Sequence, residues 1–173
     1  MRPSVIAFLL WVLTLSAAGQ SSTHPCDLPK SLDVVIEAKY PGTKVVNVPD
    51  LNEDDKEFFL KDHAGSCPGL VPVDFYGDGK PTFALALATR QTVGFNTKLV
   101  VAHRLGAKWK TLEVDKTGGP TPVTWSEDPG EYEVVYGDKI RATRPVILFV
   151  GYESWAVLYA WDGQKIKHIQ MMD

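Results

Sequence analysis

The sequence has no excess of positive charge, because 21 aspartates and glutamates outnumber its 18 lysines and arginines. The formal net charge of -3 gives no overall attraction toward phosphate backbones or anionic lipid. Nucleic-acid binding would therefore need a local basic stripe, and the sequence contains none. We expect no nucleic-acid partner.

Complete catalytic signatures are also missing. The sequence contains no glycine-rich phosphate loop, no His-Glu-x-x-His zinc motif and no Gly-x-Ser-x-Gly nucleophile elbow. Its four histidines have no metal-ligand spacing. These absences remove the nucleotide-binding and zinc-protease classes and leave a catalytic triad without support. His103 follows Leu99 and Val101 at alternate positions, so we expect it to be a hydrogen-bonded histidine at the edge of the core.

The composition is that of an ordinary globular domain, with 45% apolar, 10% aromatic and 23% charged residues. It excludes collagen, coiled coil and bulk disorder. No repeat of roughly 20 to 50 residues can be traced, which argues against a complete propeller or solenoid. Without the targeting segment described next, about 150 residues remain, which is enough for one core of normal size.

The N-terminus has the pattern of a secretory signal peptide. Arg2 precedes an apolar run from Val5 to Leu15, and the small residues Ser16, Ala17 and Ala18 follow. The run is shorter than the roughly 20 residues that cross a bilayer. We expect cleavage after Ala18, with Gly19 as the alternative, and hence a secreted or periplasmic protein. A retained membrane anchor is the competing interpretation. No later segment is apolar enough to span a membrane.

Only two cysteines occur, Cys26 and Cys67, and both lie in the part predicted to be exported. Oxidising conditions outside the cytoplasm favour a disulfide between them. Closing a loop of about 40 residues stabilises a fold by roughly 3 to 4 kcal/mol in the chain-entropy model. The alternative is a nucleophilic or redox cysteine, although no Cys-x-x-Cys pair is present. We divide the chain into a signal peptide (1–18), a flexible mature N-terminus (19–27) and a single domain (28–173).

The hydrophobic spacing predicts two helices near the start of this domain. The first covers Leu28 to Tyr40 and ends at Pro41-Gly42. The second covers Asp50 to Asp62 after a short strand from Thr43 to Val48, and its acidic first turn suits the helix dipole. We expect the second helix to turn four apolar residues inward: Leu51, Phe58, Phe59 and Leu60.

From Leu70 onward the apolar residues alternate with period two, which indicates strands. Short turns at Gly106-Ala107 and Asp162-Gly163 favour antiparallel neighbours. The prediction is one α+β domain with a mostly antiparallel β-sheet and one or two N-terminal helices. The expected strands are Leu70 to Asp74, Thr82 to Thr89, Lys98 to Leu105, Trp109 to Val114, Tyr132 to Tyr136, Val146 to Val150, Trp155 to Trp161 and Lys165 to Ile169.

Two of the predicted strands are interpreted as central strands, because neither of their faces carries charge. Val146 to Val150 is one of them. In the other, Thr82 to Thr89, one face consists of alanines small enough to let a helix pack closely. By contrast, Asp115 to Gly130 is rich in glycine and proline, and we expect the longest irregular loop there.

One short segment, from Asp74 to Phe83, has the layout of a strand-loop-strand cation site: Asp74-Phe75-Tyr76-Gly77-Asp78-Gly79-Lys80-Pro81-Thr82-Phe83. Calcium needs six to eight oxygen ligands, and alternate positions of a tight acidic loop direct carboxylates inward. Asp74 and Asp78 are the candidate side-chain ligands, and the Lys80 carbonyl is the candidate backbone ligand.

These residues resemble the calcium loop of FG-GAP or VCBS repeats, Asp-x-Asn-x-Asp-Gly-x-x-Asp followed by an apolar strand. The rest of the mature chain is loosely similar to exported bacterial proteins that carry one such loop. FG-GAP repeats usually occur in multiples that form a propeller for ligand or protein binding, and a single copy cannot close one. The resemblance implies a secreted, non-enzymatic protein.

The loop departs from the family pattern at two positions. Tyr76 stands where the family has Asn or Asp, and Thr82 stands where it has a further Asp. Because affinity follows the number of charged ligands, we expect a calcium site that is weak and occupied only at the calcium levels found outside cells, or empty. The alternative is a tight glycine turn kept for its geometry after ligand loss.

Two further constellations have a functional and a structural interpretation. Tyr152, Trp155, Tyr159 and Trp161 would form a platform for sugar rings or peptides if exposed, and part of the core if buried. Glycosidic hydrolysis needs two carboxylates at a fixed separation, and four glutamates are candidates for it: Glu127, Glu131, Glu133 and Glu153.

We therefore expect an exported, non-enzymatic accessory or binding domain whose partner is a protein or glycan outside the cytoplasm. One alternative is a carboxylate-dependent hydrolase, which requires a concave pocket holding two carboxylates. The other is an inhibitor or immunity-type partner of a secreted enzyme.

Overall fold

The computed structural model describes residues 24–90, 95–135, 137 and 139–172. The predicted signal peptide (1–18), with its cleavage site, and residues 19–23 of the predicted mature N-terminus lie outside the described residues. Within the described ranges, no helix is both long enough and apolar enough to cross a membrane.

Two short α-helices lie near the N-terminus, as predicted. Helix α1 spans Lys30–Lys39, and helix α2 spans Glu53–Asp62 after the 3-10 helix η1, Val48–Asp50. Helix α2 begins at Glu53 because the Asn52 side chain accepts a hydrogen bond from the Asp55 N–H at 2.8 Å and so caps the first turn.

The apolar residues of α2 do not all face inward. Phe59 is fully buried and Leu51, just before the helix, is also buried, whereas Phe58 and Leu60 are 38% and 41% exposed. The prediction was therefore wrong for Phe58 and Leu60. Both are next to Phe59 in sequence and project from other sides of a ten-residue helix.

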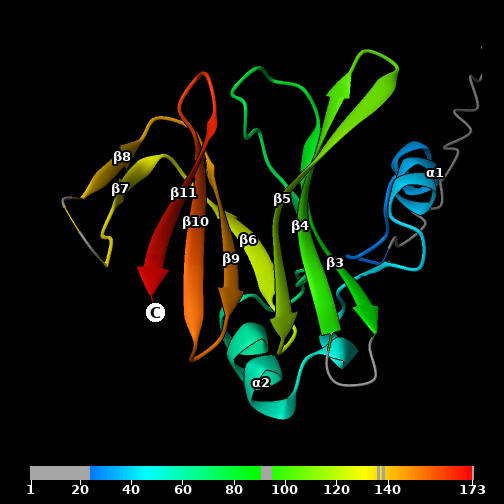
Figure 1. The fold of residues 1–173 in the computed structure, drawn as a ribbon, viewed down its shortest axis with the longest axis horizontal. Coiled ribbons are helices and arrows are strands. Elements are labelled where there is room, and N and C mark those ends of the chain that lie inside the picture. Colours follow the sequence, from blue (N-terminus) through cyan, green and yellow to red (C-terminus); the bar gives the residue numbers. More distant parts are fainter. Residues whose placement is uncertain (1–23, 91–94, 136, 138, 173) are drawn as a thin grey trace, which may run out of the picture.

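Nine of the strands form two antiparallel sheets, which confirms the α+β, mostly antiparallel fold (Figure 1). The first sheet has the order β1-β3-β4-β5, and β2 also pairs with β3. Its strands are β1 (Lys44–Val45), β2 (Leu70–Pro72), β3 (Thr82–Arg90), β4 (Phe95–Leu105) and β5 (Lys108–Gly119).

The second sheet has the order β11-β10-β9-β6, and a separate two-stranded hairpin, β7–β8, is inserted between β6 and β9. Figure 1 shows this sheet beside the first, with the hairpin at its outer side. The strands are β6 (Val123–Glu127), β7 (Gly130–Tyr132), β8 (Ile140–Ala142), β9 (Val146–Gly151), β10 (Trp155–Trp161) and β11 (Ile166–Met172).

The predicted irregular loop from Asp115 to Gly130 is largely strand. Strand β5 continues to Gly119, paired with β4, and β6 occupies Val123–Glu127, paired with β9. The prolines and glycines of this segment lie at the end of β5 and before β6 (Gly118 to Pro122) and after β6 (Pro129 and Gly130), so their density concealed the strands between them. The predicted strand from Tyr132 to Tyr136 lies earlier, as β7, and β8 was not predicted.

The core has two layers, and β3 contributes one face to each. Its alanine face (Ala84, Ala86, Ala88) belongs to the cluster between the two sheets. Its Leu85 and Leu87 belong to the cluster under α1, together with Leu32 and Ile36 of that helix. The prediction that a helix packs on the alanines was thus wrong: the second sheet does, while α1 covers the leucines beside β3 (Figure 1).

The predicted disulfide is confirmed. Cys26 and Cys67 are bonded, with 5.1 Å between their Cα atoms, and both are buried. The bond attaches the turn at residues 24–27, within the predicted flexible N-terminus, to the segment that leads into β2. It therefore fixes the start of the domain against the first sheet.

Gly69 lies where the chain leading into β2 meets the chain leaving β1. The Gly69 carbonyl accepts a hydrogen bond from Ala86 of β3 at 2.9 Å, and the Ala86 carbonyl accepts one from Val46 at 3.0 Å. A Cβ atom at Gly69 would lie 2.5 Å from the Val46 oxygen and 2.6 Å from its nitrogen. The contact is with backbone, which cannot rotate away, so only glycine fits.

We predict that Gly69→Ala destabilises the domain by about 3 kcal/mol because it forces the two backbone segments apart. Gly118→Ala is the matched control, since a Cβ there meets nothing within 4 Å, and it should change stability by no more than about 0.5 kcal/mol. Urea unfolding followed by fluorescence measures both. Equal stability of the two variants would contradict the proposed backbone contact.

A polar contact also connects the two sheets at the β5 side. The Tyr159 hydroxyl of β10 donates a hydrogen bond to the Asp115 carboxylate of β5, and Tyr159 is 1% exposed. Burial, followed by this carboxylate, raises the pKa of Tyr159 well above its ordinary value. Burial likewise raises the pKa of Tyr152 from 10.0 to about 12, with smaller contributions from Asp62 and Asp55.

These shifts predict a loss of stability at alkaline pH. Above pH 10 the unfolded chain releases the tyrosine protons while the folded chain retains them, so unfolding becomes more favourable up to about pH 12. Denaturant unfolding between about pH 8 and about pH 11 should show this decline, and Tyr159→Phe should make it less steep. If the stability of Tyr159→Phe falls with pH in parallel with that of wild type, Tyr159 does not contribute to the alkaline loss of stability.

Candidate functional site

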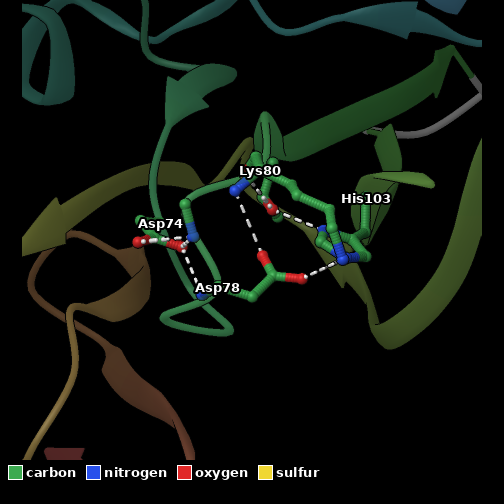
Figure 2. Close-up of polar contacts among 6 residues, drawn as sticks. Asp74, Asp78, Lys80 and His103 are labelled. Carbon is green, nitrogen blue, oxygen red and sulfur yellow. Dashed lines mark hydrogen bonds and ion pairs between the residues drawn. The ribbon is translucent and has the colours of Figure 1, made fainter. Parts of the chain in front are cut away.

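The loop between β2 and β3 closes on its own carboxylates. Asp74 accepts hydrogen bonds from the backbone N–H groups of Asp78, at 3.1 Å, and Gly79, at 3.2 Å (Figure 2). Gly77 and Gly79 have φ angles of 65° and 70°, which non-glycine residues rarely adopt. The tight acidic turn predicted from sequence is therefore present.

The Asp78 carboxylate lies between two basic side chains (Figure 2). It is 2.8 Å from the Lys80 ammonium and 3.3 Å from His103 Nε2, and it also accepts from the Lys80 N–H at 3.2 Å. These contacts, led by the Lys80 side chain, lower the pKa of Asp78. The Lys80 carbonyl accepts a hydrogen bond from Thr82 at 3.3 Å.

The donor set in this geometry does not fit calcium. Asp74, Asp78 and the Lys80 carbonyl, the three sequence-predicted ligands, all accept hydrogen bonds from the protein. A cation beside Asp78 would also meet the Lys80 ammonium. Among the described residues, no group of three or more His, Cys, Asp or Glu side chains is placed to hold a metal ion. The arrangement fits the alternative interpretation, a glycine turn kept for its geometry.

Tyr76 packs against other aromatic rings. Instead of offering an oxygen to the loop, its ring lies 4.6 Å from the His103 ring and 5.0 Å from the Trp161 ring. His103 is 8% exposed, and its Nδ1 lies 2.8 Å from the Thr82 hydroxyl, so the predicted hydrogen-bonded histidine is confirmed. Through its contact with Trp161, Tyr76 connects the loop to β10.

The predicted aromatic platform is mainly a packing surface. Tyr159 is buried, and the other three side chains are only half-buried, so this stripe does not form an exposed plane. Trp155 packs on Phe149 at 5.2 Å between ring centroids, and Trp161 packs on Tyr76. Tyr152 packs on Phe58 at 5.8 Å. The core interpretation accounts for all these contacts.

A hollow of about 690 Å³ lies between the β2–β3 loop and the segment after β6. It brings together two of the candidate glutamates, Glu127 and Glu131, and adds Asp128 and Asp74, which sequence reasoning did not place there. Glu133 is elsewhere, in an ion pair with Lys139 at 3.0 Å, and Glu153 lies in the β9–β10 turn. Neither of these two lines the hollow.

A second hollow, of about 380 Å³, adjoins the first and shares Pro72 and Ser126 with it. Its wall is aromatic: the His63 ring lies 4.8 Å from the Trp125 ring and 5.3 Å from the Phe59 ring. The two hollows lie next to each other along β2 and β6. We call the pair of hollows the rim groove, with an aromatic end at Phe59, His63 and Trp125 and an acidic end at Glu127, Asp128 and Glu131.

The backbone along the rim groove belongs to two strand edges. Strand β2 pairs with β3, and β6 pairs with β9, while the two strands face each other across the groove. At one end the Thr124 N–H donates to the Pro68 carbonyl at 2.7 Å. Because backbone groups alternate sides along a strand, the N–H and C=O of Ser126 point to the same side as those of Thr124.

Sequence reasoning missed this groove because it placed Trp125 and Ser126 in an irregular loop. The sequence signal that could have predicted strand β6 is the alternation of apolar and polar residues in Val123-Thr124-Trp125-Ser126. The sequence matches no family model, and comparison with curated proteins and with solved structures finds no match.

We predict that the melting temperature of the purified domain is the same in millimolar calcium and in chelator, because the loop carboxylates already have protein partners. A ligand that binds only the folded state must raise stability. Differential scanning calorimetry of wild type and Asp78→Asn gives the measurement. A higher midpoint in calcium that disappears in Asp78→Asn would restore the calcium-site hypothesis.

Proposed function

We propose that this protein is an exported binding domain without catalytic activity of its own, and that it holds part of another macromolecule in the rim groove. The observation that carries the proposal is the pair of neighbouring hollows, one with an aromatic wall and one lined by carboxylates. Small polar and aromatic groups around a preformed hollow are the usual features of a recognition site.

Export is the second part of the proposal. Its support is the N-terminal pattern of Arg2, the apolar run and Ala18, together with the Cys26–Cys67 disulfide, a bond typical of oxidising compartments. The resemblance of the β2–β3 loop to FG-GAP repeats also favours a binding protein outside the cytoplasm. An inhibitor or immunity-type role is one form of this function, in which the partner is a single secreted enzyme.

A carboxylate-dependent hydrolase is the second candidate, because Glu127 and Glu131 do share a hollow. The surroundings favour binding over hydrolysis. Glu127 accepts a hydrogen bond from the Trp125 indole at 3.2 Å, and Asp128 and Glu131 are exposed to solvent. A general acid for glycosidic cleavage needs a carboxyl group shielded from water, so that it keeps its proton near neutral pH.

The test is a binding screen of the purified mature protein against glycans and secreted proteins, with a variant that fills the groove. Ser126→Tyr places a ring where the two hollows meet, and Ala38→Tyr on the exposed side of α1 is the control. We expect a ligand that binds wild type and Ala38→Tyr but not Ser126→Tyr. A ligand retained equally by all three would locate binding elsewhere, and turnover of a glycan lost in Glu131→Gln would favour the hydrolase.

A further inference from the structure

Three turns lie at one end of the domain, the upper end in Figure 1: the β2–β3 loop, the turn between β4 and β5, and the turn between β10 and β11. Asp78 of the loop lies 3.3 Å from His103 of β4. The Tyr76 ring of the same loop lies 5.0 Å from the Trp161 ring of β10. We call this surface the basic end, because it carries six lysines and arginines: Lys80, Arg104, Lys108, Lys110, Lys165 and Lys167.

The positive charge of the basic end is only partly neutralised. The three turns carry three aspartates, of which Asp74 accepts hydrogen bonds from its own loop. Asp78 is paired with Lys80 at 2.8 Å, and Asp162 is paired with Lys167 at 3.2 Å. The other cations are exposed and form no ion pair with a described residue: Arg104, Lys108, Lys110 and Lys165.

Two exposed leucines lie among these cations, on the hairpin of β4 and β5. Leu105 is 44% exposed and Leu112 is 48% exposed. The strand register places both leucines on the same face of the hairpin as Lys108 and Lys110. A surface that combines exposed leucines with lysines suits the boundary of a bilayer, where the cations meet phosphates and the leucines reach the acyl chains.

The opposite end of the domain carries the opposite charge. Helix α2 lies at the lower end in Figure 1 and has five aspartates and glutamates against two lysines. The carboxylates of the rim groove lie toward β7, across the molecule from the β4–β5 hairpin. Separated charges orient a protein in the field of an anionic surface, here with the basic end toward it. Since this field acts within about 10 Å, the net negative charge of the chain does not prevent the contact.

The basic end lacks the features of a nucleic-acid site. Single strands stack on exposed aromatic rings, but Trp109 is 9% exposed and Arg104 lies 5.7 Å from the centre of its ring. Trp161 packs on Tyr76. Exposed leucines add apolar burial at a lipid surface and nothing at a phosphate backbone. No basic run is visible in the sequence, because the six cations come from three separate stretches of chain.

We propose that the basic end is a membrane-contact surface, by which the folded domain binds reversibly to a bilayer that contains anionic phospholipid. Its lysines and arginines meet the headgroup phosphates, while Leu105 and Leu112 enter the boundary of the acyl chains. This inference goes beyond the proposed function and does not depend on the ligand of the rim groove.

The test is cosedimentation of the purified mature protein with vesicles of equimolar phosphatidylcholine and phosphatidylglycerol, and with vesicles of phosphatidylcholine alone. We expect saturable binding to the mixed vesicles that weakens as salt is added, and much weaker binding to phosphatidylcholine. Inorganic phosphate should compete no better than chloride at equal ionic strength. Equal binding to the two kinds of vesicle, binding to neither, or stronger competition by phosphate overturns the proposal.

Charge variants locate the contact. Lys108→Glu with Lys110→Glu should lower the affinity for mixed vesicles by about tenfold or more. The matched control, Lys30→Glu with Lys61→Glu, makes the same change in net charge on α1 and α2 and should leave the affinity within about twofold. If circular dichroism shows that the first variant does not fold, Lys108→Gln with Lys110→Gln replaces it, with a loss of about fivefold or more. Equal affinities of the hairpin variant and the control overturn the proposal.

A second pair of variants tests the leucines. Leu105→Ser with Leu112→Ser should lower the affinity for mixed vesicles by about fivefold or more and leave its salt dependence unchanged. A polarity-sensitive fluorophore attached at Ala107→Cys should shift to shorter wavelength on these vesicles, and one at Ala38→Cys on α1 should not. Unchanged affinity without a shift overturns the proposal. Binding to a DNA duplex through Lys108 and Lys110, with no binding to vesicles, would assign the surface to nucleic acid instead.

Discussion

The alanine face of β3 sets the distance between the two sheets, and the rest of the structure follows from it. Because Ala84, Ala86 and Ala88 are small, the apolar strand β9 and its neighbours pack directly against them, and one continuous cluster forms between the sheets. The opposite face of β3, with its leucines, holds α1. The backbones of the two sheets also meet where β6 passes β2, with the Thr124 N–H bonded to the Pro68 carbonyl, and the rim groove lies beside this contact.

Much of this fold could be predicted from the sequence because its signals are local. Period-two alternation identified the strands now labelled β3, β4, β9 and β10, and the Asp162-Gly163 turn identified the hairpin of β10 and β11. Predicting the Cys26–Cys67 disulfide required only the number of cysteines and the expectation that the chain matures in an oxidising compartment. What could not be predicted depends on tertiary packing: which layer covers the alanines, and where the chain continues as strand through a segment rich in proline and glycine. The candidate site was hidden for the same reason, since Glu127 and Trp125 become neighbours of Phe59 and Asp74 only after the sheets pack.

The β2–β3 loop keeps its shape through contacts within the protein. The turn needs positive φ at Gly77 and Gly79, and the Asp74 carboxylate holds it closed through backbone N–H groups, a task independent of any ion. The Lys80 ammonium supplies positive charge beside Asp78, and His103 Nε2 lies 3.3 Å from the same carboxylate. Tyr76 packs on Trp161 of the other sheet, so the loop is connected to the core.

Four strands of each sheet follow the same order in space as in sequence, a similarity that is not evident from the sequence. Strands β2, β3, β4 and β5 follow one another in space as in sequence, and so do β6, β9, β10 and β11, with the hairpin β7–β8 inserted after the first strand of the second set. In each set the connection into the second strand ends with a basic residue and a proline, Lys80-Pro81 and Arg144-Pro145. The hairpin is anchored mainly through Ala142, Tyr132 and Ile140 and contributes no strand to the main ladder. Insertions or exchanges in it can therefore diversify one wall of the groove during evolution while the double-layered scaffold stays intact.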